Sequence, residues 1–305
     1  MRIVLAVLTR DRPEMLRACL ASLAAMRAPD GCETTLVVID NNSATETLAR
    51  NRAAVGAQVG AFPARMVVET RQGIPVARNR AIAEAEAVRA DALVFLDDDQ
   101  TVPPDWLSVL VAAHRETGVD VVKSAVDWRF EPPGRFCDHF AGDFDDPGAP
   151  LREVGVASVA TNGVLIGARV WRGMGERFDE RFPLNGGEDT LFFRKALSGG
   201  GVAMLTRETR ATEHCPAAKQ RAGWLLRRAY RVGINEIVMG LKPRSRADAL
   251  TRGLLRALYA GVLALIWCWR PRERFRQLMK GAKALGMVVG AIGLDYAEYR
   301  TVVGR

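Results

Sequence analysis

Short apolar runs alternate with stretches of helical periodicity over the first 126 residues, and this alternation constrains the fold more than any other feature. The runs are rich in β-branched residues and carry little charge, which is typical of strands buried on both faces of a sheet. We predict strands at Ile3–Leu8, Thr35–Ile39, Ala64–Val68, Ala92–Leu96 and Val119–Val126. We predict a helix that opens at Pro13 and carries apolar residues to Leu23, and further helices at Pro75–Ala90 and Pro103–Arg115. This order predicts an α/β fold with a mainly parallel central sheet flanked by helices.

Polar residues gather where these strands end. Thr9-Arg10-Asp11 follows the first strand, Asp40-Asn41-Asn42-Ser43 the second and Asp97-Asp98-Asp99 the fourth. Ligands of open α/β sheets bind outside the carboxyl ends of the strands, so we expect these side chains to face one site. Three adjacent carboxylates need a cation or many hydrogen bonds, and their hard oxygens suit Mg²⁺ or Mn²⁺. A solvated acidic turn is the alternative.

The periodicity fails from residue 128 to residue 151, where we expect an irregular segment. Its aromatic side chains would either line a binding cleft or pack into the core: Trp128, Phe130, Phe136 and Phe140. Strand-like character returns over Val154–Val170, a helix follows at Asp189–Ser198, and Val202–Leu205 is the last predicted strand. Beyond Pro216 the pattern is helical.

The net charge of +8 is divided unevenly along the chain. Residues 1–214 carry 25 Lys and Arg against 30 Asp and Glu, whereas residues 215–305 carry 18 against 5. The chain therefore has a mildly acidic body and a strongly basic C-terminal region. Five cysteines without a C-x-x-C pair indicate a reducing compartment. The charges at residues 10–12 follow the first apolar run too closely for a signal peptide.

The basic region interleaves arginines with large apolar residues, as in Trp224–Arg231 and Arg270–Lys280. Its longest charge-free apolar stretches are Ala257–Trp269, with 13 residues, and Ala284–Leu294, with 11. A membrane span needs about 20 apolar residues, so we expect helices that lie on an anionic membrane surface and do not cross it. Binding to nucleic acid is not expected, because the apolar stretches would have no role in it. The alternative is that these helices only pack on the body of the protein.

Five motifs, in this order, carry a resemblance to a known family: Val7–Pro13, Val38–Ser43, Gly73–Ala81, Phe95–Asp99 and Gly186–Phe193. Each motif is weak alone, but together the chain resembles glycosyltransferase family 2 over about residues 1–214. The resemblance implies the GT-A fold of the nucleotide-diphospho-sugar transferases, with a Rossmann-like, mainly parallel sheet. We therefore expect a GT-A catalytic domain at residues 1–218 and a basic, amphipathic helical region at residues 219–305.

The resemblance also implies roles for residues at the strand ends. Thr9 and Asp40 would hold the nucleotide base, and Arg78 the ribose or phosphate side. The other expected contacts to the nucleotide-sugar are Arg12, Asp97, Asp98 and Asn162. The expected ligands of Mn²⁺ or Mg²⁺ are Asp99, Asp97 and His214. The plain alternatives are a solvated charge for Arg78, a structural imidazole for His214 and a β-bulge at Asn162.

Glu188 and Asp189 follow a Gly-Gly turn and open a predicted helix. Two negative charges there would complement the helix dipole. By resemblance they would be catalytic, with Asp189 as the general base that deprotonates an acceptor hydroxyl and Glu188 in support.

The function implied by the resemblance is inverting, metal-dependent transfer of a sugar from a nucleotide-diphospho-sugar, UDP-linked by default. The acceptor would be a hydroxyl of a glycan or lipid-linked glycan at the cytoplasmic face of the membrane, as in bacterial polysaccharide assembly or cell-envelope glycan synthesis. The protein would be cytoplasmic and peripherally associated with the membrane. Two other functions remain open. Asp97 and Asp99 also fit the D-x-D-x-T motif of a haloacid dehalogenase-like phosphatase, and the chain could be a non-catalytic membrane-bound adaptor.

Overall fold

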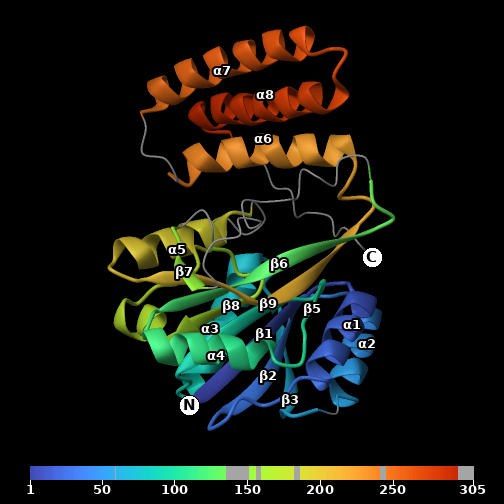
Figure 1. Ribbon diagram of the computed structural model, residues 1–305, viewed down its shortest axis with the longest axis vertical. Coiled ribbons are helices and arrows are strands. Elements are labelled where there is room, and N and C mark those ends of the chain that lie inside the picture. Colours follow the sequence, from blue (N-terminus) through green and yellow to red (C-terminus); the bar gives the residue numbers. More distant parts are fainter. Residues whose placement is uncertain (59, 135–150, 156–158, 182–185, 241–244, 295–305) are drawn as a thin grey trace.

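The computed structural model describes residues 1–58, 60–134, 151–155, 159–181, 186–240 and 245–294. A central sheet is flanked by helices, and a layer of three further helices lies at one end of the molecule (Figure 1). The strands are β1 (Arg2–Thr9), β2 (Glu33–Asn41), β3 (Ala64–Glu69), β4 (Ala92–Asp97), β5 (Gln100–Thr101), β6 (Val121–Glu131), β7 (Leu151–Glu153), β8 (Val164–Gly167) and β9 (Ala203–Pro216). The helices are α1 (Pro13–Ala24), α2 (Thr45–Gly56), α3 (Ile74–Ala87), α4 (Trp106–Thr117), the π-helical turn η4 (Arg169–Gly173), α5 (Glu188–Ser198), α6 (Ala222–Val238), α7 (Arg246–Ile266) and α8 (Pro271–Ala291).

The sheet has the strand order β3-β2-β1-β4-β8-β6-β9-β5, with β7 paired to β9. Strands β1 to β4 are parallel, whereas β8 is antiparallel to both of its neighbours, β4 and β6. Strands β6 and β9 are parallel to each other, and β5 and β7 pair antiparallel with β9. The predicted α/β class is confirmed. The sheet is mixed, however, because the reversed strand β8 separates a parallel half from a mixed half.

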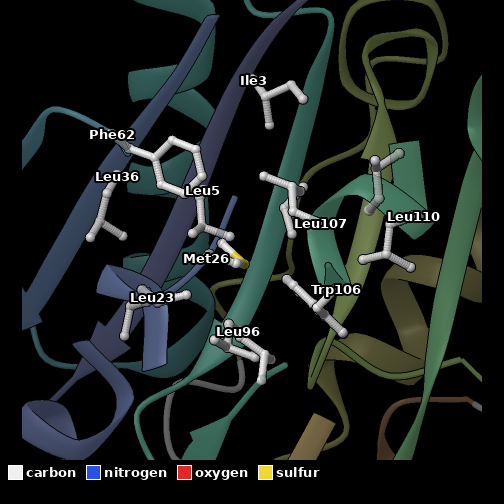
Figure 2. Close-up of a cluster of buried hydrophobic side chains, with 14 of the residues drawn as sticks. Ile3, Leu5, Leu23, Met26, Leu36, Phe62, Leu96, Trp106, Leu107 and Leu110 are labelled. Carbon is white, nitrogen blue, oxygen red and sulfur yellow. The ribbon is translucent and has the colours of Figure 1, made fainter. Parts of the chain in front are cut away.

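The two faces of the sheet bury separate hydrophobic clusters, because successive residues of a strand point to opposite faces. In β1, Ile3 and Leu5 join the cluster that contains residues of α1, α2 and α4, whereas Val4 and Ala6 join the one that contains residues of α3 and α5. Figure 2 shows the first cluster, where side chains of the strands meet those of the helices. Cover on both faces explains why these strands appear in the sequence as continuous apolar runs.

Several boundaries differ from the prediction for identifiable reasons. Helix α2 is not apparent in the sequence, because Asn51 and Val55 are its buried residues and the rest of it faces outward. Strand β9 continues past the predicted end at Leu205, because it alternates buried and partly exposed residues and so lacks a continuous apolar run. Strand β6 likewise extends into the segment expected to be irregular, and β8 occupies only part of the predicted Val154–Val170 strand. Phe136 and Phe140 lie outside the described residues.

Helices α6, α7 and α8 form a further layer, in which α8 lies between the other two (Figure 1). Leu225 of α6 and Phe275 of α8 share a buried hydrophobic cluster with Cys215 of β9, so the layer packs against the sheet there. Glycines let α6 and α8 approach closely. A Cβ atom on Gly233 would lie 1.9 Å from the carbonyl oxygen of Lys283, and one on Gly286 would lie 1.9 Å from that of Tyr230. Lys283 Nζ also pairs with Glu236 Oε1 at 2.8 Å. The predicted helical character of the basic region is confirmed, and its helices pack into one compact layer.

Helix α7 packs its small residues inward and exposes large apolar ones. Ala249, Gly253, Ala260 and Ala264 are buried. The exposed side chains, which recur every three or four residues along one face, are Leu254, Leu255, Leu258, Tyr259, Val262, Leu265 and Ile266. By length and composition alone, α7 could also cross a membrane. It is longer than the predicted apolar stretch because the helix already begins at Arg246.

The substitution Gly286→Ala tests the close packing of α6 on α8. It should lower the free energy of unfolding by about 1–3 kcal/mol, because the new methyl group would overlap the Tyr230 carbonyl. Gly261→Ala in α7 is the matched control, since no described atom outside the local helix backbone lies within 4 Å of its Cβ position. It should leave stability unchanged or raise it by up to about 1 kcal/mol. Chemical denaturation measures both, and equal stabilities of the two variants would contradict the packing.

Candidate active site

Strands β1, β2 and β4 end at the same edge of the sheet. Thr9 lies opposite Asp40 across the β1–β2 pair, and Leu8 lies opposite Asp97 across the β1–β4 pair. This register brings the polar residues that follow the three strands together, as their positions in the sequence predict.

Asp98 is buried and is held by residues that follow the first strand. Thr9 Oγ1 donates a hydrogen bond to Asp98 Oδ2 at 2.9 Å, and Arg12 Nη1 lies 3.2 Å from Asp98 Oδ1. Burial raises the pKa of Asp98 to about 7, and the charge of Arg12 opposes this shift. Three residues that were expected to contact a nucleotide therefore bind one another in this structure.

Asp99, the main expected metal ligand, is paired with two cations. Lys219 Nζ lies 3.0 Å and Arg12 Nη1 lies 3.6 Å from Asp99 Oδ2. Burial lowers the pKa of Lys219, but the charges of Asp99 and Glu213 raise it by more. Lys219 belongs to none of the five sequence motifs, and only the fold brings it to the site.

Asp97 is half-buried at the end of β4. Burial raises its pKa, and the negative charge of Asp99 raises it further. A divalent cation would relieve the repulsion between two neighbouring carboxylates. Mg²⁺ in particular needs only one or two carboxylates when substrate phosphates supply its other ligands. Among the residues that the structure describes, no group of three His, Cys, Asp or Glu side chains is arranged to hold an ion. The donor chemistry thus fits an ion held by Asp97 and Asp99 together with a bound diphosphate.

His214 lies at the same edge of the site. Its backbone N–H donates to the carbonyl oxygen of Asp99 at 2.8 Å, and its Nε2 lies 3.4 Å from Thr101 Oγ1. With Asp98 and Asp99 it lines a cavity of about 230 Å³. The fold therefore brings His214 beside the carboxylates from a distant part of the chain.

Glu188 and Arg78 form a buried ion pair. The Arg78 guanidinium also lies over the Phe178 ring, 5.4 Å from its centroid. Burial raises the pKa of Glu188, and the charge of Arg78 opposes the shift. Arg78 is therefore not a solvated charge on its helix, because its guanidinium is buried and paired with Glu188.

Asp189 is half-buried in the first turn of α5. Its Oδ1 accepts a hydrogen bond from the Thr190 backbone N–H at 2.7 Å, so it complements the positive end of the helix as expected. Burial and the charge of Asp99 are the larger causes of the raised pKa of Asp97, and the charge of Asp189 raises it further. The negative charge of Asp189 thus acts on Asp97 at the end of β4.

The structure differs from the expectation at Asp40. Its carboxylate has no exposed surface: Oδ1 accepts from the Ser43 backbone N–H at 2.8 Å and Oδ2 from Asn51 Nδ2 at 2.7 Å. Asp40 therefore holds the turn after β2 and anchors α2, and it is not open to a nucleotide base. This role could not be predicted from the sequence, because Asn51 lies in α2, a helix without a clear hydrophobic periodicity.

Two buried ionisable residues lie beneath the Asn162–Gly163 turn. Lys123 Nζ donates to the carbonyl oxygens of Ser124 at 2.9 Å and of Asn162 at 2.5 Å. Asn162 Nδ2 donates to Glu213 Oε2 at 3.1 Å. Burial lowers the pKa of Lys123 to about 7 and raises that of Glu213 to about 7. The sequence signal for Lys123 is a lone cation inside the apolar strand run Val119–Val126.

The pH dependence of stability tests the burial of Lys123. The pKa of Lys123 is about 7 in the folded chain and has its ordinary value of 10.5 when the chain unfolds. The unfolded chain therefore binds more protons above pH 7, so stability should rise with pH there. Between pH 7 and 8.5 the free energy of unfolding of the wild type should gain about 2 kcal/mol relative to Lys123→Met. Parallel stability curves for the two proteins in metal-free buffer would contradict this.

Comparison with known families and proteins agrees with this geometry. Residues 4–139 match the family model described as Glycosyl transferase family 2. The chain is also 30% identical over 304 residues to a curated relative, "Succinoglycan biosynthesis protein ExoM" of Rhizobium meliloti (strain 1021). That match covers 98% of this chain and 95% of the relative.

Solved structures share the fold at low sequence identity. S. aureus TarS 1-349 in complex with UDP has a TM-score of 0.54 at 17% identity, covering 94% of this chain and 90% of TarS 1-349. GalNAc-T7 with UDP, GalNAc and Mn²⁺ has a TM-score of 0.54 at 15% identity, covering 77% of this chain. This chain spans 48% of GalNAc-T7 and 40% of a longer TarS structure. Together with the acidic strand end and the curated relative, these likenesses lead to one conclusion: the chain belongs to glycosyltransferase family 2 and has the GT-A fold of a glycosyltransferase.

Proposed function

We propose that the protein is an inverting, metal-dependent glycosyltransferase that moves a sugar from a UDP-sugar to a hydroxyl group of a glycan or lipid-linked glycan. The observation that carries the proposal is the acidic end of β4, where the buried carboxylate of Asp99 is paired with Lys219 and Arg12. Membership of a glycosyltransferase family decides against the phosphatase and adaptor alternatives.

The donor side of the site is the acidic end of β4. Asp97 and Asp99 would hold Mn²⁺ or Mg²⁺, and the ion would supply charge stabilisation to the leaving diphosphate. Lys219 and Arg12 already lie against Asp99, so they add positive charge next to the same leaving group. The proposal draws on GalNAc-T7, whose solved structure carries UDP and Mn²⁺, and on TarS, whose structure carries UDP.

The acceptor side of the site is the first turn of α5. Asp189 is half-buried and its neighbour Glu188 is engaged by Arg78, so Asp189 is the carboxylate left to take the proton from the acceptor hydroxyl. One base on the side opposite the leaving group is what inversion by direct displacement requires. Glu188 and Arg78 support the base by fixing the start of the helix.

The chain divides by role into a catalytic domain at residues 1–218 and a helical region at residues 219–305. The relative ExoM bears the name of a succinoglycan biosynthesis protein, and this supports a role in extracellular polysaccharide or cell-envelope glycan synthesis. Lipid-linked acceptors for such glycans lie at the cytoplasmic face of the membrane, where a basic helical region would bring the enzyme close to them.

The helical region docks on the membrane through α7. The outward face of α7 consists of large apolar side chains, and Leu265 is 75% exposed. Aromatic and cationic residues follow directly, with the Arg270 guanidinium 5.2 Å from the Trp267 ring centroid. An apolar helix face bordered by Trp and Arg suits the boundary between acyl chains and anionic headgroups. We favour an interfacial position over a span, because Asp248 and three arginines lie on the first half of α7.

Turnover of UDP-, GDP- and dTDP-sugars with Mn²⁺ tests the catalytic assignment. Asp189→Asn should lower kcat by about 10²–10⁴-fold, because it removes the general base. Asp99→Asn should abolish Mn²⁺-dependent binding of the nucleotide. Glu116→Gln replaces an exposed carboxylate on α4 and should behave as wild type. The transferase proposal would be refuted by a wild type that neither turns over any donor nor binds any nucleotide in a metal-dependent manner.

Flotation with vesicles that contain anionic lipid tests the membrane face. The full-length protein should float, and the double variant Leu258→Asp, Leu265→Asp should partition at least tenfold less, because burying one leucine contributes about 1.5–3 kcal/mol. Val88→Asp is the control, since Val88 is an exposed apolar residue of the catalytic body. Alkaline carbonate should release the bound protein. Equal flotation of the double variant would refute docking through α7, and resistance to carbonate would indicate a span.

A further inference from the structure

The catalytic turn before α5 is held by a side chain from the C-terminal helical layer. Asn235, on α6, is buried, and its Nδ2 donates a hydrogen bond to the carbonyl oxygen of Gly186 at 2.6 Å. Gly186 and Gly187 have φ values of 69° and 90° and directly precede Glu188. The amide of Asn235 therefore holds the left-handed turn from which the acid pair enters the helix.

The turn packs against α6 at van der Waals distance. A Cβ atom on Gly187 would lie 3.4 Å from Asn235 Nδ2 and 3.5 Å from Met239 Sδ. Arg194, one turn further along α5, donates to the carbonyl oxygen of Gly240 at the end of α6. Helix α6 is thus attached to α5 both before and after the acid pair.

Charge on α6 also acts on the acid pair. Arg231 lies one helical turn before Asn235 and is buried. Burial raises the pKa of Glu188, the charge of Arg78 opposes this, and the charge of Arg231 opposes it as well. The same face of α6 therefore contributes a hydrogen bond, van der Waals contacts and a positive charge to the start of α5.

Helix α6 is itself rigidly attached to α8. Gly233 and Gly286 bring the two backbones into contact, and Glu236 pairs with Lys283 across them. In Figure 1, α6 lies between α5 and α8. The start of α5 is therefore connected through α6 to the helices that carry the exposed apolar face.

We propose that Asn235 is a positioning residue for the acid pair: through Gly186 it orients the turn so that Asp189 faces the acceptor position. The inference rests on the proposed role of Asp189 as the base. It makes α6 a working part of the catalytic site, although its sequence lies in the basic C-terminal region. A displacement of about 1 Å at a reacting group can lower a rate by about a hundredfold, so this one contact can matter for catalysis.

Three variants of the full-length protein test the proposal. Asn235→Leu removes the amide donor but keeps the branching and number of side-chain heavy atoms, Asn235→Gln keeps a donor on a longer side chain, and Arg227→Ala replaces an exposed residue of the same helix. Hydrogen exchange of the amides at residues 186–193 reports the order of the turn without any substrate. Donor turnover and the affinity for UDP with Mn²⁺ separate catalysis from donor binding.

Asn235→Leu should speed exchange at residues 186–193 about tenfold and lower kcat about tenfold to a hundredfold, with UDP affinity within about twofold of wild type. Asn235→Gln should lie between Asn235→Leu and wild type, and Arg227→Ala should match wild type. Unchanged exchange at residues 186–193, unchanged kcat, or a loss of UDP affinity equal to the loss of kcat would overturn the proposal.

Rapid exchange throughout the Asn235→Leu chain would mean that this variant has lost its fold. The test then rests on Asn235→Gln, judged by exchange at residues 186–193, kcat and UDP affinity. A wild type without turnover would refute the proposed function instead. The exchange measurement needs no donor, so it still decides whether Asn235 holds the turn.

Discussion

The adjacent carboxylates of Asp97, Asp98 and Asp99 repel one another, and the other charged residues of the site are placed where they offset this repulsion. Asp97 is the last residue of β4, a strand buried on both faces, and the two carboxylates that follow it are buried, so little solvent is available to screen them. The fold supplies Arg12 from the loop after β1 and Lys219 from the turn after β9 to offset part of this repulsion. A divalent cation at Asp97 and Asp99, as proposed for the donor side of the site, would offset more of it.

Helix α6 connects the helical layer to the start of α5. Toward the body it contacts the Gly186–Gly187 turn through Asn235, and away from it α6 packs on α8 through glycines. Small residues at a helix crossing leave little freedom for sliding, because any side chain there would meet backbone atoms. A chain built in this way can keep the helices with the exposed apolar face and the Gly186–Gly187 turn in a fixed relation.

Much of the fold could be predicted, because buried strands leave a strong signal in the sequence. Ile3–Leu8 and Ala92–Leu96 are examples whose apolar runs match β1 and β4 closely. The elements that escaped prediction are half-exposed ones: α2, with few buried residues, and the outer part of β9, with alternating burial. Their positions depend on pairing with distant strands, and a local pattern does not contain that information.

By itself the sequence determined the α/β class, the acidic strand end, the acid pair at the start of α5 and the separation of an acidic body from a basic helical region. Tertiary structure decided which of those charges pair. It turned Asp40 inward onto Asn51, directed Arg78 to Glu188, and brought Lys219 to Asp99. The physical reason is that ion pairs and hydrogen bonds depend on distances of a few ångströms between residues that lie far apart in the chain, and only the packed fold sets those distances.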